Sequence, residues 1–360
     1  MKTIAHVITG LEVGGAEQML LAIATRLPPT EWQQRVYCLM GHGPIGAELE
    51  RRGIPVTYLQ HRYWRLYHGL RRDRPAILIT YLIHADLLGR VIGRLAGVKT
   101  IIASKHGALL QWEWLKYLDR GSRWLVTHYI AVSHSLKNKL IADLHLPAAN
   151  ITVIPNGLDV DRYAVDPAVG QALRATLNIP PTANVIGTIA NLRAGKGHAD
   201  LLNAFHHLAP RYPDTRLLIV GDGDRRSALQ KQVADLALIN QVIFTGYRDD
   251  VPALLNVIDI FALPTYFEGM SMALLEAMAA GKPIVTTAIA ENCELLVDQI
   301  TAFLTPVGDI PALSAALQRL LDDPVLRQRL GQQAREVCRQ HYDIATTTVA
   351  FTTVLNNLCR

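Results

Sequence analysis

The feature that most limits the fold of this chain is a repeated alternation between short β-rich runs and longer segments with helical patterns. Such alternation predicts parallel strands joined by crossover helices. In the first half we expect strands at residues 3–9, 35–39, 56–59, 76–81, 100–104, 129–133 and 151–154. After a polar segment near residue 166 the alternation starts again, and we expect further strands at 185–190, 216–220 and 260–264. With 360 residues the chain is long enough for two such domains, each with its own core.

Composition limits the class of protein further. Hydrophobic residues make up 50% of the chain, but no run of about 18 uncharged apolar residues occurs, so we expect no membrane-spanning helix. The first residues, MKTIAHVITG, lead straight into a glycine loop, which predicts a strand rather than a secretion signal and therefore a cytoplasmic protein. The four cysteines form no CxxC pair and no cluster with histidine, so we expect reduced thiols and no metal site.

Basic residues are concentrated in the first half. Residues 1–165 contain 20 Lys and Arg against 12 Asp and Glu, whereas the remainder contains 16 against 19. Two stretches in this half, 61–74 and 111–124, combine Trp and Tyr with Lys and Arg. Such stretches are typical of an anionic membrane interface, but they also fit a solvated helix face with its aromatic side chains in the core, or an acceptor cleft. No nucleic-acid recognition motif accompanies the charge, so we expect no nucleic-acid partner.

The segment 267–285 carries two carboxylates in an otherwise apolar setting. Its sequence predicts a helix over 271–280, with Ser271 near the N-terminus and a glycine just behind the C-terminus. Glu276 shares a face with apolar residues, and a buried carboxylate is costly unless hydrogen-bond donors meet it. Ribose hydroxyls are suitable donors, and pairing with a partner helix is the structural alternative. Between Glu268 and this helix, Gly269 and Met270 offer backbone N–H groups at which an anion or hydroxyls can dock.

Glycine loops follow expected strands at three places. Gly14 and Gly15 let the backbone approach a ligand in front of a helix N-terminus, although a plain tight turn has the same sequence. Arg193 and Lys196 lie in a loop before a helix, where two cations can clamp a diphosphate; a basic loop without a ligand is the alternative. The sequence GDGD at 221–224 lacks the third glycine of GxGxxG, which argues against a dinucleotide-binding dehydrogenase.

These segments together resemble the retaining glycosyltransferases of family 4. The resemblance covers nearly the whole chain, and its motifs occur in the expected order: Gly14-Gly15, NLRAGKG at 191–197, GDG at 221–223, EGMS at 268–271, and the Glu-x7-Glu pair Glu268 and Glu276. It implies the GT-B fold, in which two Rossmann-like α/β domains face each other across a cleft. Residues 1–165 would bind the acceptor and 166–340 the nucleotide sugar, while 341–360 would form a helix that crosses back to the first domain.

The resemblance also implies a role for each site residue. Gly14 and Gly15 would face the donor diphosphate and the acceptor, and His106 would contact the transferred sugar, although a surface histidine is the alternative. Arg193 and Lys196 would stabilise the leaving diphosphate; many relatives have that arginine at the position of Asn191. The remaining donor contacts would be Tyr247 and Arg248 near the base, Glu268 on the sugar, Glu276 on the ribose, and backbone groups of Gly269, Met270 and Ser271.

The implied reaction is transfer of a sugar with retention of its anomeric configuration, and we expect a front-face substitution. The donor would be a UDP-sugar, with a GDP-sugar as the alternative, and no cofactor or metal would be required. The acceptor would be lipid-linked or a polysaccharide of the cell envelope, with the protein peripheral on the inner face of the cytoplasmic membrane. Two other readings stay open: a sugar-nucleotide epimerase of the same fold, and a non-catalytic protein that binds a sugar nucleotide or a membrane.

Overall fold

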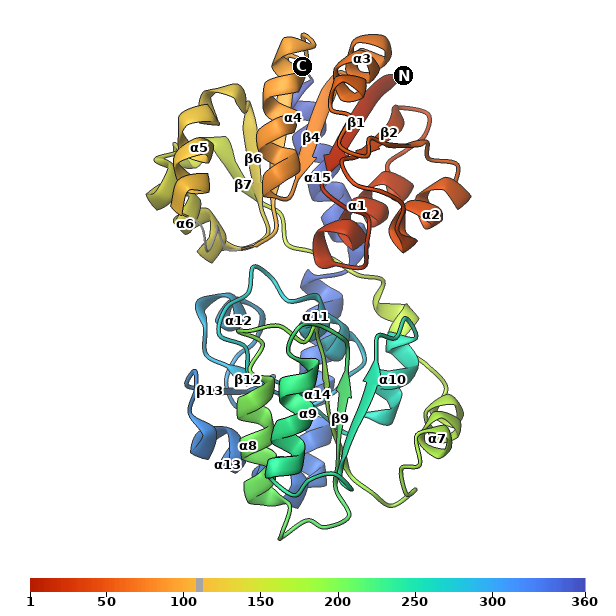
Figure 1. Ribbon diagram of the computed structural model, residues 1–360, viewed down its shortest axis with the longest axis vertical. Helices are drawn as coiled ribbons and strands as arrows, with labels where there is room; N and C mark the ends of the chain where they lie inside the picture. The colour runs from red at the N-terminus through yellow and green to blue at the C-terminus, as the bar shows by residue number, and fades with distance from the viewer. Residues whose placement is uncertain (108–112, 360) are drawn as a thin grey trace. The chain divides into compact units, whose positions relative to one another are not determined.

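A computed structural model describes residues 1–107 and 113–359, and it divides into two compact units (Figure 1). Unit 1 comprises Met1–Gly157 and Ile344–Arg360, and unit 2 comprises Leu158–Asp343. The chain therefore leaves unit 1, completes unit 2 and returns to unit 1 for its last helix.

Unit 1 is built on one parallel sheet of seven strands in the order β3-β2-β1-β4-β5-β6-β7. The strands are β1 (Lys2–Ile8), β2 (Trp32–Cys38), β3 (Val56–Tyr58), β4 (Ile77–Tyr81), β5 (Thr100–Lys105), β6 (His128–Ala131) and β7 (Ile151–Val153). All seven were expected from the alternation, with ends that differ by at most three residues.

The α-helices of unit 1 connect successive strands, as a parallel sheet requires, except for the last helix of the chain. They are α1 (Gly15–Arg26), α2 (Pro44–Arg51), α3 (Trp64–Asp73), α4 (Ile83–Leu95), α5 (Glu113–Ser122), α6 (His134–Leu144) and the returning α15 (Ile344–Leu358). Helix α15 packs against α1, and its Phe351, Val354 and Leu355 belong to the same buried cluster as Ile4 and Leu20. The end of the chain thus completes the core of unit 1.

Unit 2 contains a six-stranded parallel sheet in the order β10-β9-β8-β11-β12-β13. Its strands are β8 (Val185–Ile189), β9 (Arg216–Val220), β10 (Val242–Gly246), β11 (Ile260–Leu263), β12 (Ile284–Thr287) and β13 (Phe303–Thr305). Its α-helices are α7 (Pro167–Thr176), α8 (His198–Leu208), α9 (Arg226–Asp235), α10 (Val251–Val257), α11 (Met272–Ala279), α12 (Ala290–Leu295), α13 (Ile310–Asp322) and α14 (Pro324–His341). Helices and strands alternate along the unit, and the short 3-10 helix η3 (Val160–Tyr163) precedes them.

Both sheets reverse their strand order at one point. The switch lies between β1 and β4 in unit 1 and between β8 and β11 in unit 2. In open parallel α/β sheets, ligands bind outside the carboxyl ends of the strands at this switch point, because the loops from the two neighbouring strands turn away in opposite directions. The loops that follow these four strands are therefore the first places to look for a site.

Candidate active site

The loop after β8 and the loop after β11 dock against each other in unit 2. Gly195 accepts two hydrogen bonds at its carbonyl oxygen, from the Tyr266 backbone N at 2.8 Å and from Thr265 Oγ1 at 3.0 Å. Gly197 has φ +72°, and a Cβ there would lie 1.9 Å from the carbonyl oxygen of Pro264. A side chain at residue 197 is therefore incompatible with this contact, and the glycine allows the two loops to meet.

This docking brings Lys196 and Glu268 together. Lys196 Nζ lies 2.7 Å from Glu268 Oε1, and the two side chains retain 25% and 9% of their exposure. The sequence predicted separate partners for them, a diphosphate for the lysine and a sugar for the glutamate. Their pairing places a cation and a carboxylate side by side at the switch point of the sheet.

Arg193 differs from Lys196 in its surroundings. Its side chain is exposed, and it takes part in none of the ion pairs formed among the described residues. An exposed guanidinium beside a glycine-containing loop can pair with two phosphate oxygens at once. The exposed position of Arg193 is compatible with its predicted role at the diphosphate.

Helix α11 begins as the sequence predicted. Ser271 is its N-cap, and the Ser271 Oγ accepts a hydrogen bond from the Leu274 backbone N at 3.4 Å. Gly281 follows the helix with φ +66°, a left-handed conformation that favours glycine. Gly269, Met270 and Ser271 are all buried at this end of the helix.

Glu276 is buried in the middle of α11, with 8% of its surface exposed. The Tyr163 hydroxyl, from η3, donates a hydrogen bond to Glu276 Oε1 at 3.0 Å. Burial raises the pKa of Glu276 to about 7, and the hydrogen bond from Tyr163 and the charge of Arg162 oppose that rise only in part. Its partner is thus a tyrosine hydroxyl from the 3-10 helix η3, so the structural alternative, pairing with another helix, applies to one of the two oxygens of Glu276.

Glu276 Oε2 makes no hydrogen bond within the part of the chain that the structure describes, and it is not one of the fully buried polar atoms. One carboxylate oxygen is therefore held by the protein, while the other stays open to a donor from outside. A ribose hydroxyl is a donor of the right kind.

The loop after β10 carries the two residues predicted near the base. Tyr247 is 54% exposed. Arg248 forms a bidentate pair with Asp250, with Nε–Oδ1 and Nη2–Oδ2 distances of 2.7 and 2.5 Å. Arg248 would therefore have to give up this pair before its side chain could contact a base.

In unit 1, the loop after β1 places Gly14 and Gly15 at the N-terminus of α1. Gly14 is the N-cap residue with an extended backbone, and a Cβ there would lie 2.4 Å from Glu17 Oε2. Burial raises the pKa of Glu17, in the first turn of α1. The absence of a side chain at Gly14 leaves room for this carboxylate beside the helix N-terminus.

His106 directly follows β5 and is partly buried, with its Nδ1 enclosed. Its Nε2 lies 2.9 Å from Ser104 Oγ, and its ring stacks on Tyr81 with centroids 5.8 Å apart. Burial lowers the pKa of His106 to about 4, against an opposing effect of the Asn156 side chain. A neutral imidazole at pH 7 can accept or donate a hydrogen bond but cannot supply a positive charge.

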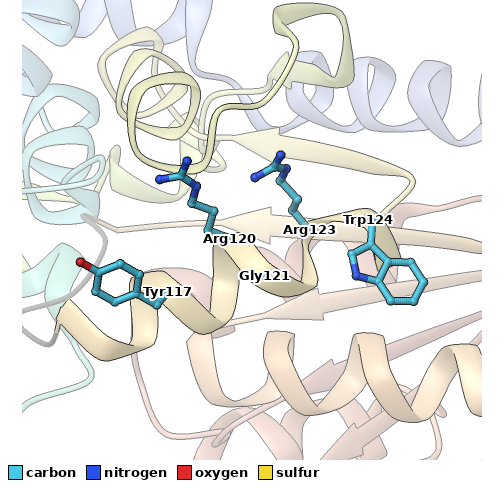
Figure 2. A pocket seen from close by; sticks show the side chains of 5 residues that line it. All are labelled: Tyr117, Arg120, Gly121, Arg123 and Trp124. Carbon is cyan, nitrogen blue, oxygen red and sulfur yellow. The ribbon is translucent and has the colours of Figure 1, made fainter.

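The basic aromatic stretch 111–124 forms α5 and the 3-10 turn η1 (Arg123–Leu125) that follows it; Gln111 and Trp112 lie outside the described residues. On its surface lies an open hollow of about 450 Å³ (Figure 2). The hollow is lined by Tyr117, Arg120, Gly121, Arg123 and Trp124.

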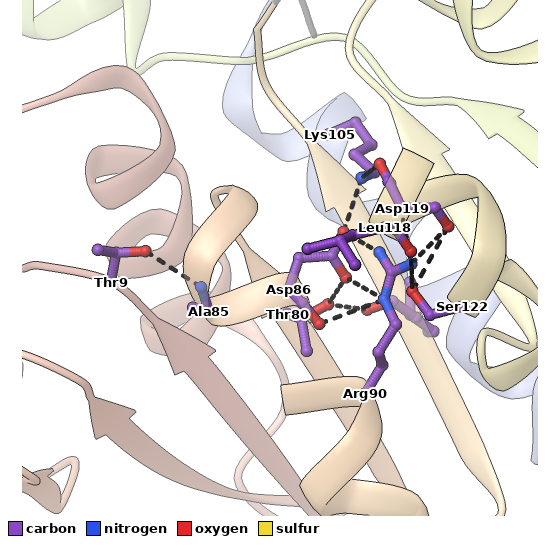
Figure 3. Close-up of polar contacts among 10 residues, drawn as sticks. Thr9, Thr80, Ala85, Asp86, Arg90, Lys105, Leu118, Asp119 and Ser122 are labelled. Atoms are coloured by element: carbon purple, nitrogen blue, oxygen red, sulfur yellow. Dashed lines mark hydrogen bonds and ion pairs between the residues drawn. The ribbon is translucent and has the colours of Figure 1, made fainter. Parts of the chain in front are cut away.

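Sequence reasoning missed a buried charge network beneath α5 (Figure 3). Arg90 Nη1 lies 2.7 Å from Asp119 Oδ1, and Lys105 Nζ lies 2.7 Å from both Asp119 Oδ2 and Asp86 Oδ2. Arg90 also pairs with Asp86, one turn earlier in α4. The charges of Lys105 and Arg90 lower the pKa of Asp86 although burial opposes them. The i,i+4 pair Asp86 and Arg90 in an apolar helix was the available sequence signal.

The described residues offer neither a metal site nor a membrane-spanning helix. Asp222, a carboxylate in the loop after β9, is paired with Arg226 at 2.8 Å. Within residues 1–107 and 113–359, no group of three or more His, Cys, Asp or Glu side chains could hold a metal ion. None of the helices in the same residues is both long and apolar enough to cross a membrane.

Comparison with known families and proteins gives consistent matches over most of the chain. Residues 170–337 match the sequence model described as glycosyl transferases group 1, and residues 13–162 match that of glycosyltransferase family 4. A UDP-Gal:alpha-D-GlcNAc-diphosphoundecaprenol alpha-1,3-galactosyltransferase of Escherichia coli is 29% identical over 344 residues, which cover 90% of this chain and 89% of that protein. A GDP-mannose-dependent alpha-(1-6)-phosphatidylinositol monomannoside mannosyltransferase of Mycolicibacterium smegmatis is 29% identical over 68% of this chain and 66% of its own length.

Solved structures match the architecture over the full length. The crystal structure of Anabaena HepE in complex with UDP-glucose has a TM-score of 0.90 and 23% identity, and covers 99% of this chain and 100% of its own. The lipopolysaccharide outer core galactosyltransferase WaaB in its apo form has a TM-score of 0.73 at 18% identity, with 99% of each chain covered. These neighbours are GT-B glycosyltransferases, so the predicted fold class is confirmed.

Proposed function

We propose that this chain, a member of the family 4 glycosyltransferases, moves a sugar from a UDP-sugar to a lipid-linked or oligosaccharide hydroxyl. The two family models and the relatives establish the membership. The observation that carries this proposal is the buried Glu276 carboxyl, one oxygen of which is bound by Tyr163 while the other is open. A fold that keeps a carboxyl in an otherwise apolar helix, at a cost in desolvation, is consistent with a ligand that supplies the missing donors.

The donor is held by unit 2 in this proposal. Glu276 accepts hydrogen bonds from the ribose hydroxyls, and Glu268 binds hydroxyls of the transferred sugar. Arg193, Lys196 and the backbone N–H groups near Met270 meet the diphosphate. UDP is favoured over GDP because the Escherichia coli relative and the HepE complex are named with UDP, although the mycobacterial relative is named with GDP-mannose.

The reaction we propose is a front-face substitution that retains the anomeric configuration. The acceptor hydroxyl attacks the anomeric carbon from the side on which the diphosphate departs, so one C–O bond forms as another breaks. The proton of the acceptor hydroxyl passes to an oxygen of the leaving diphosphate. No metal or cofactor is required, because Arg193 and Lys196 stabilise the departing charge. Removal of one such donor costs about 2.7–4 kcal/mol of barrier in comparable sites.

The acceptor is proposed to meet unit 1, near His106 and the loop of Gly14 and Gly15. A neutral His106 can hydrogen-bond a sugar hydroxyl, in agreement with its low pKa. Because the acceptor of the Escherichia coli relative is linked to undecaprenol diphosphate, we propose an acceptor of this class. The reaction would take place at the inner face of the cytoplasmic membrane, in synthesis of a cell-envelope glycan.

The test is nucleotide release from a panel of UDP- and GDP-sugars, with and without a polyprenyl-diphosphate-linked sugar. Release that requires the acceptor, with an α-linkage retained in the product by NMR, supports the proposal. Sugar interconversion without release would support an epimerase, and binding without turnover a non-catalytic protein. Lys196→Ala should lower turnover about 10²–10³-fold, whereas the control Lys231→Ala, at an exposed position of α9, should not.

A further inference from the structure

Two aromatic side chains stand half-exposed in the loop after β11, directly before Glu268. Tyr266 is 44% exposed and Phe267 is 47% exposed, whereas Pro264 and Thr265 just before them are buried. Single exposed apolar residues are common on protein surfaces, so this exposure decides nothing by itself. What distinguishes the two residues is the way in which each ring is held.

The Phe267 ring rests on the backbone of Gly195, in the loop after β8. A Cβ at Gly195 would lie 2.3 Å from Phe267 Cε1 and 2.5 Å from Phe267 Cζ. Any other residue at this position would therefore displace the ring, and the φ of +86° at Gly195 also favours glycine. The Phe267 backbone is fixed too, because Thr265 Oγ1 donates a hydrogen bond to the Phe267 carbonyl oxygen at 3.2 Å. The ring thus has its place before any ligand binds, which lowers the entropy cost of using it in a binding site.

Tyr266 is anchored at its polar end instead. Its hydroxyl donates a hydrogen bond to Asp200 Oδ2, in the first turn of α8, at 2.7 Å. A Cβ at Gly308 would lie 3.3 Å from the same hydroxyl oxygen, so the tyrosine also reaches the loop after β13. The hydroxyl of Tyr266 explains its place at the surface, whereas Phe267 presents a purely apolar ring there.

The Phe267 ring lies beside the groups that the proposed function assigns to the donor. Phe267 directly precedes Glu268, and Gly195 directly precedes Lys196. Lys196 Nζ and Glu268 Oε1 are 2.7 Å apart. One pair of docked loops therefore supplies a cation for phosphate oxygens, a carboxylate for hydroxyl groups and an apolar ring. Sites for small molecules have this composition, an apolar wall with a few polar groups that fix the orientation of the ligand.

A pyranose offers partners for both the carboxylate and the ring. Its hydroxyl groups stand at the rim, where a carboxylate accepts their hydrogen bonds, and its two faces carry apolar C–H groups. An aromatic ring laid over such a face removes apolar surface of both partners from water. We propose that Phe267 stacks on a C–H face of the transferred sugar while Glu268 binds its hydroxyl groups. Phe267 thereby fixes the plane of the sugar next to its bond to the diphosphate. The inference rests on the proposed function, because it takes the UDP-sugar bound to unit 2 as the ligand.

The experiment is calorimetry of the full chain with UDP and with UDP-glucose, UDP-galactose and UDP-N-acetylglucosamine. Phe267→Ala should lower the affinity for the UDP-sugar that the wild type binds by about tenfold, the effect of uncovering about 50–60 Å² of apolar surface. The affinity for UDP should stay within about twofold of the wild type, because UDP lacks the sugar that the ring covers. Phe267→Tyr keeps the ring and should keep the affinity for the UDP-sugar.

The matched control is Ile239→Ala, which removes another exposed apolar side chain of unit 2, between α9 and β10; it should change neither affinity. Unchanged circular dichroism and melting temperature identify variants that are folded. The inference is overturned if the wild type binds none of the UDP-sugars, or if folded Phe267→Ala binds them like the wild type. It is also overturned if Phe267→Ala loses affinity for UDP to the same extent, or if Phe267→Tyr binds as weakly as Phe267→Ala.

The binding measurement needs neither an acceptor nor turnover. A protein that binds UDP-sugars but does not transfer them would therefore contradict the proposed function, while the comparison of UDP with UDP-sugar still decides the role of Phe267.

Discussion

Replacing Glu276 by glutamine should make the protein more stable and a poorer binder of its donor. The carboxyl has an ordinary pKa of 4.5 and a pKa of about 7 in the fold, because burial disfavours its charged form. The folded state therefore holds this proton over a pH range in which the unfolded chain has lost it. By linkage, the contribution of Glu276 to stability falls as the pH rises from about 4.5 to about 7, and it stays low above that.

The size of the effect follows from the pKa difference. The rise of the pKa from 4.5 to about 7 corresponds to about 3 kcal/mol of unfolding free energy. The wild type loses all of this at pH 8 and less than about 1 kcal/mol of it at pH 5. Glu276→Gln keeps the size of the side chain but does not titrate, so it escapes this loss. We expect the variant to exceed the wild type by about 3 kcal/mol at pH 8 and to lie close to it at pH 5.

Urea unfolding at pH 5 and pH 8 measures the difference. All five tryptophans lie in unit 1, at residues 32, 64, 112, 114 and 124, so tryptophan fluorescence follows unit 1 while circular dichroism follows both units. The stabilisation should appear in the circular dichroism transition. UDP affinity, measured by calorimetry in the same buffers, should fall in the variant. The reasoning is refuted if Glu276→Gln is no more stable than the wild type at pH 8, or if the gain is the same at both pH values.

Three more outcomes are expected. Tyr163→Phe removes the hydrogen bond that holds down the pKa of Glu276, so UDP affinity should fall and should recover as the pH is raised from 7 to 9; calorimetry with pH-independent affinity would contradict this. Asp119→Ala leaves Arg90 and Lys105 with one buried carboxylate between them. It should lower the free energy of unfolding in urea by about 3–5 kcal/mol. The exposed control Asp143→Ala, on α6, should lower it by less than about 0.5 kcal/mol. EDTA should leave sugar transfer unchanged, since the charge of the leaving diphosphate is assigned to Arg193 and Lys196, and activity restored only by added metal would disprove that assignment.

The sequence predicted all seven strands of the first sheet and the strands β8, β9 and β11 of the second, because strands buried on two faces read as continuous apolar runs. The strands Val242–Gly246, Ile284–Thr287 and Phe303–Thr305 escaped prediction, and the last two are short and end in threonines. These threonines are nevertheless buried: Thr287 Oγ1 donates a hydrogen bond to the Thr265 backbone oxygen. A short polar end of a strand carries no periodic signal.

In the site, features that depend on neighbouring residues could be predicted from the sequence, whereas contacts between distant residues could not. The burial of Glu276 could be predicted from its own helix, because the neighbouring positions are apolar. Its partner Tyr163 is 113 residues away, and the partners Lys196 and Glu268 are separated by 72 residues. No spacing rule connects such distant residues, so their pairing appeared only with the fold. The buried charges around Lys105 were missed as well, and of these only the pair Asp86 and Arg90 is close enough in the sequence to have given a local signal.

The return of α15 to unit 1 bears on how the protein is made. During synthesis the segment 158–343 emerges whole before residues 344–358, which supply Phe351, Val354 and Leu355 to the core of unit 1. The half that leaves the ribosome first is thus the last to be finished, and until then it carries an uncovered apolar strip beside α1. A nascent chain halted at residue 343 should therefore show a protease-resistant second unit joined to a first unit that chaperones still recognise.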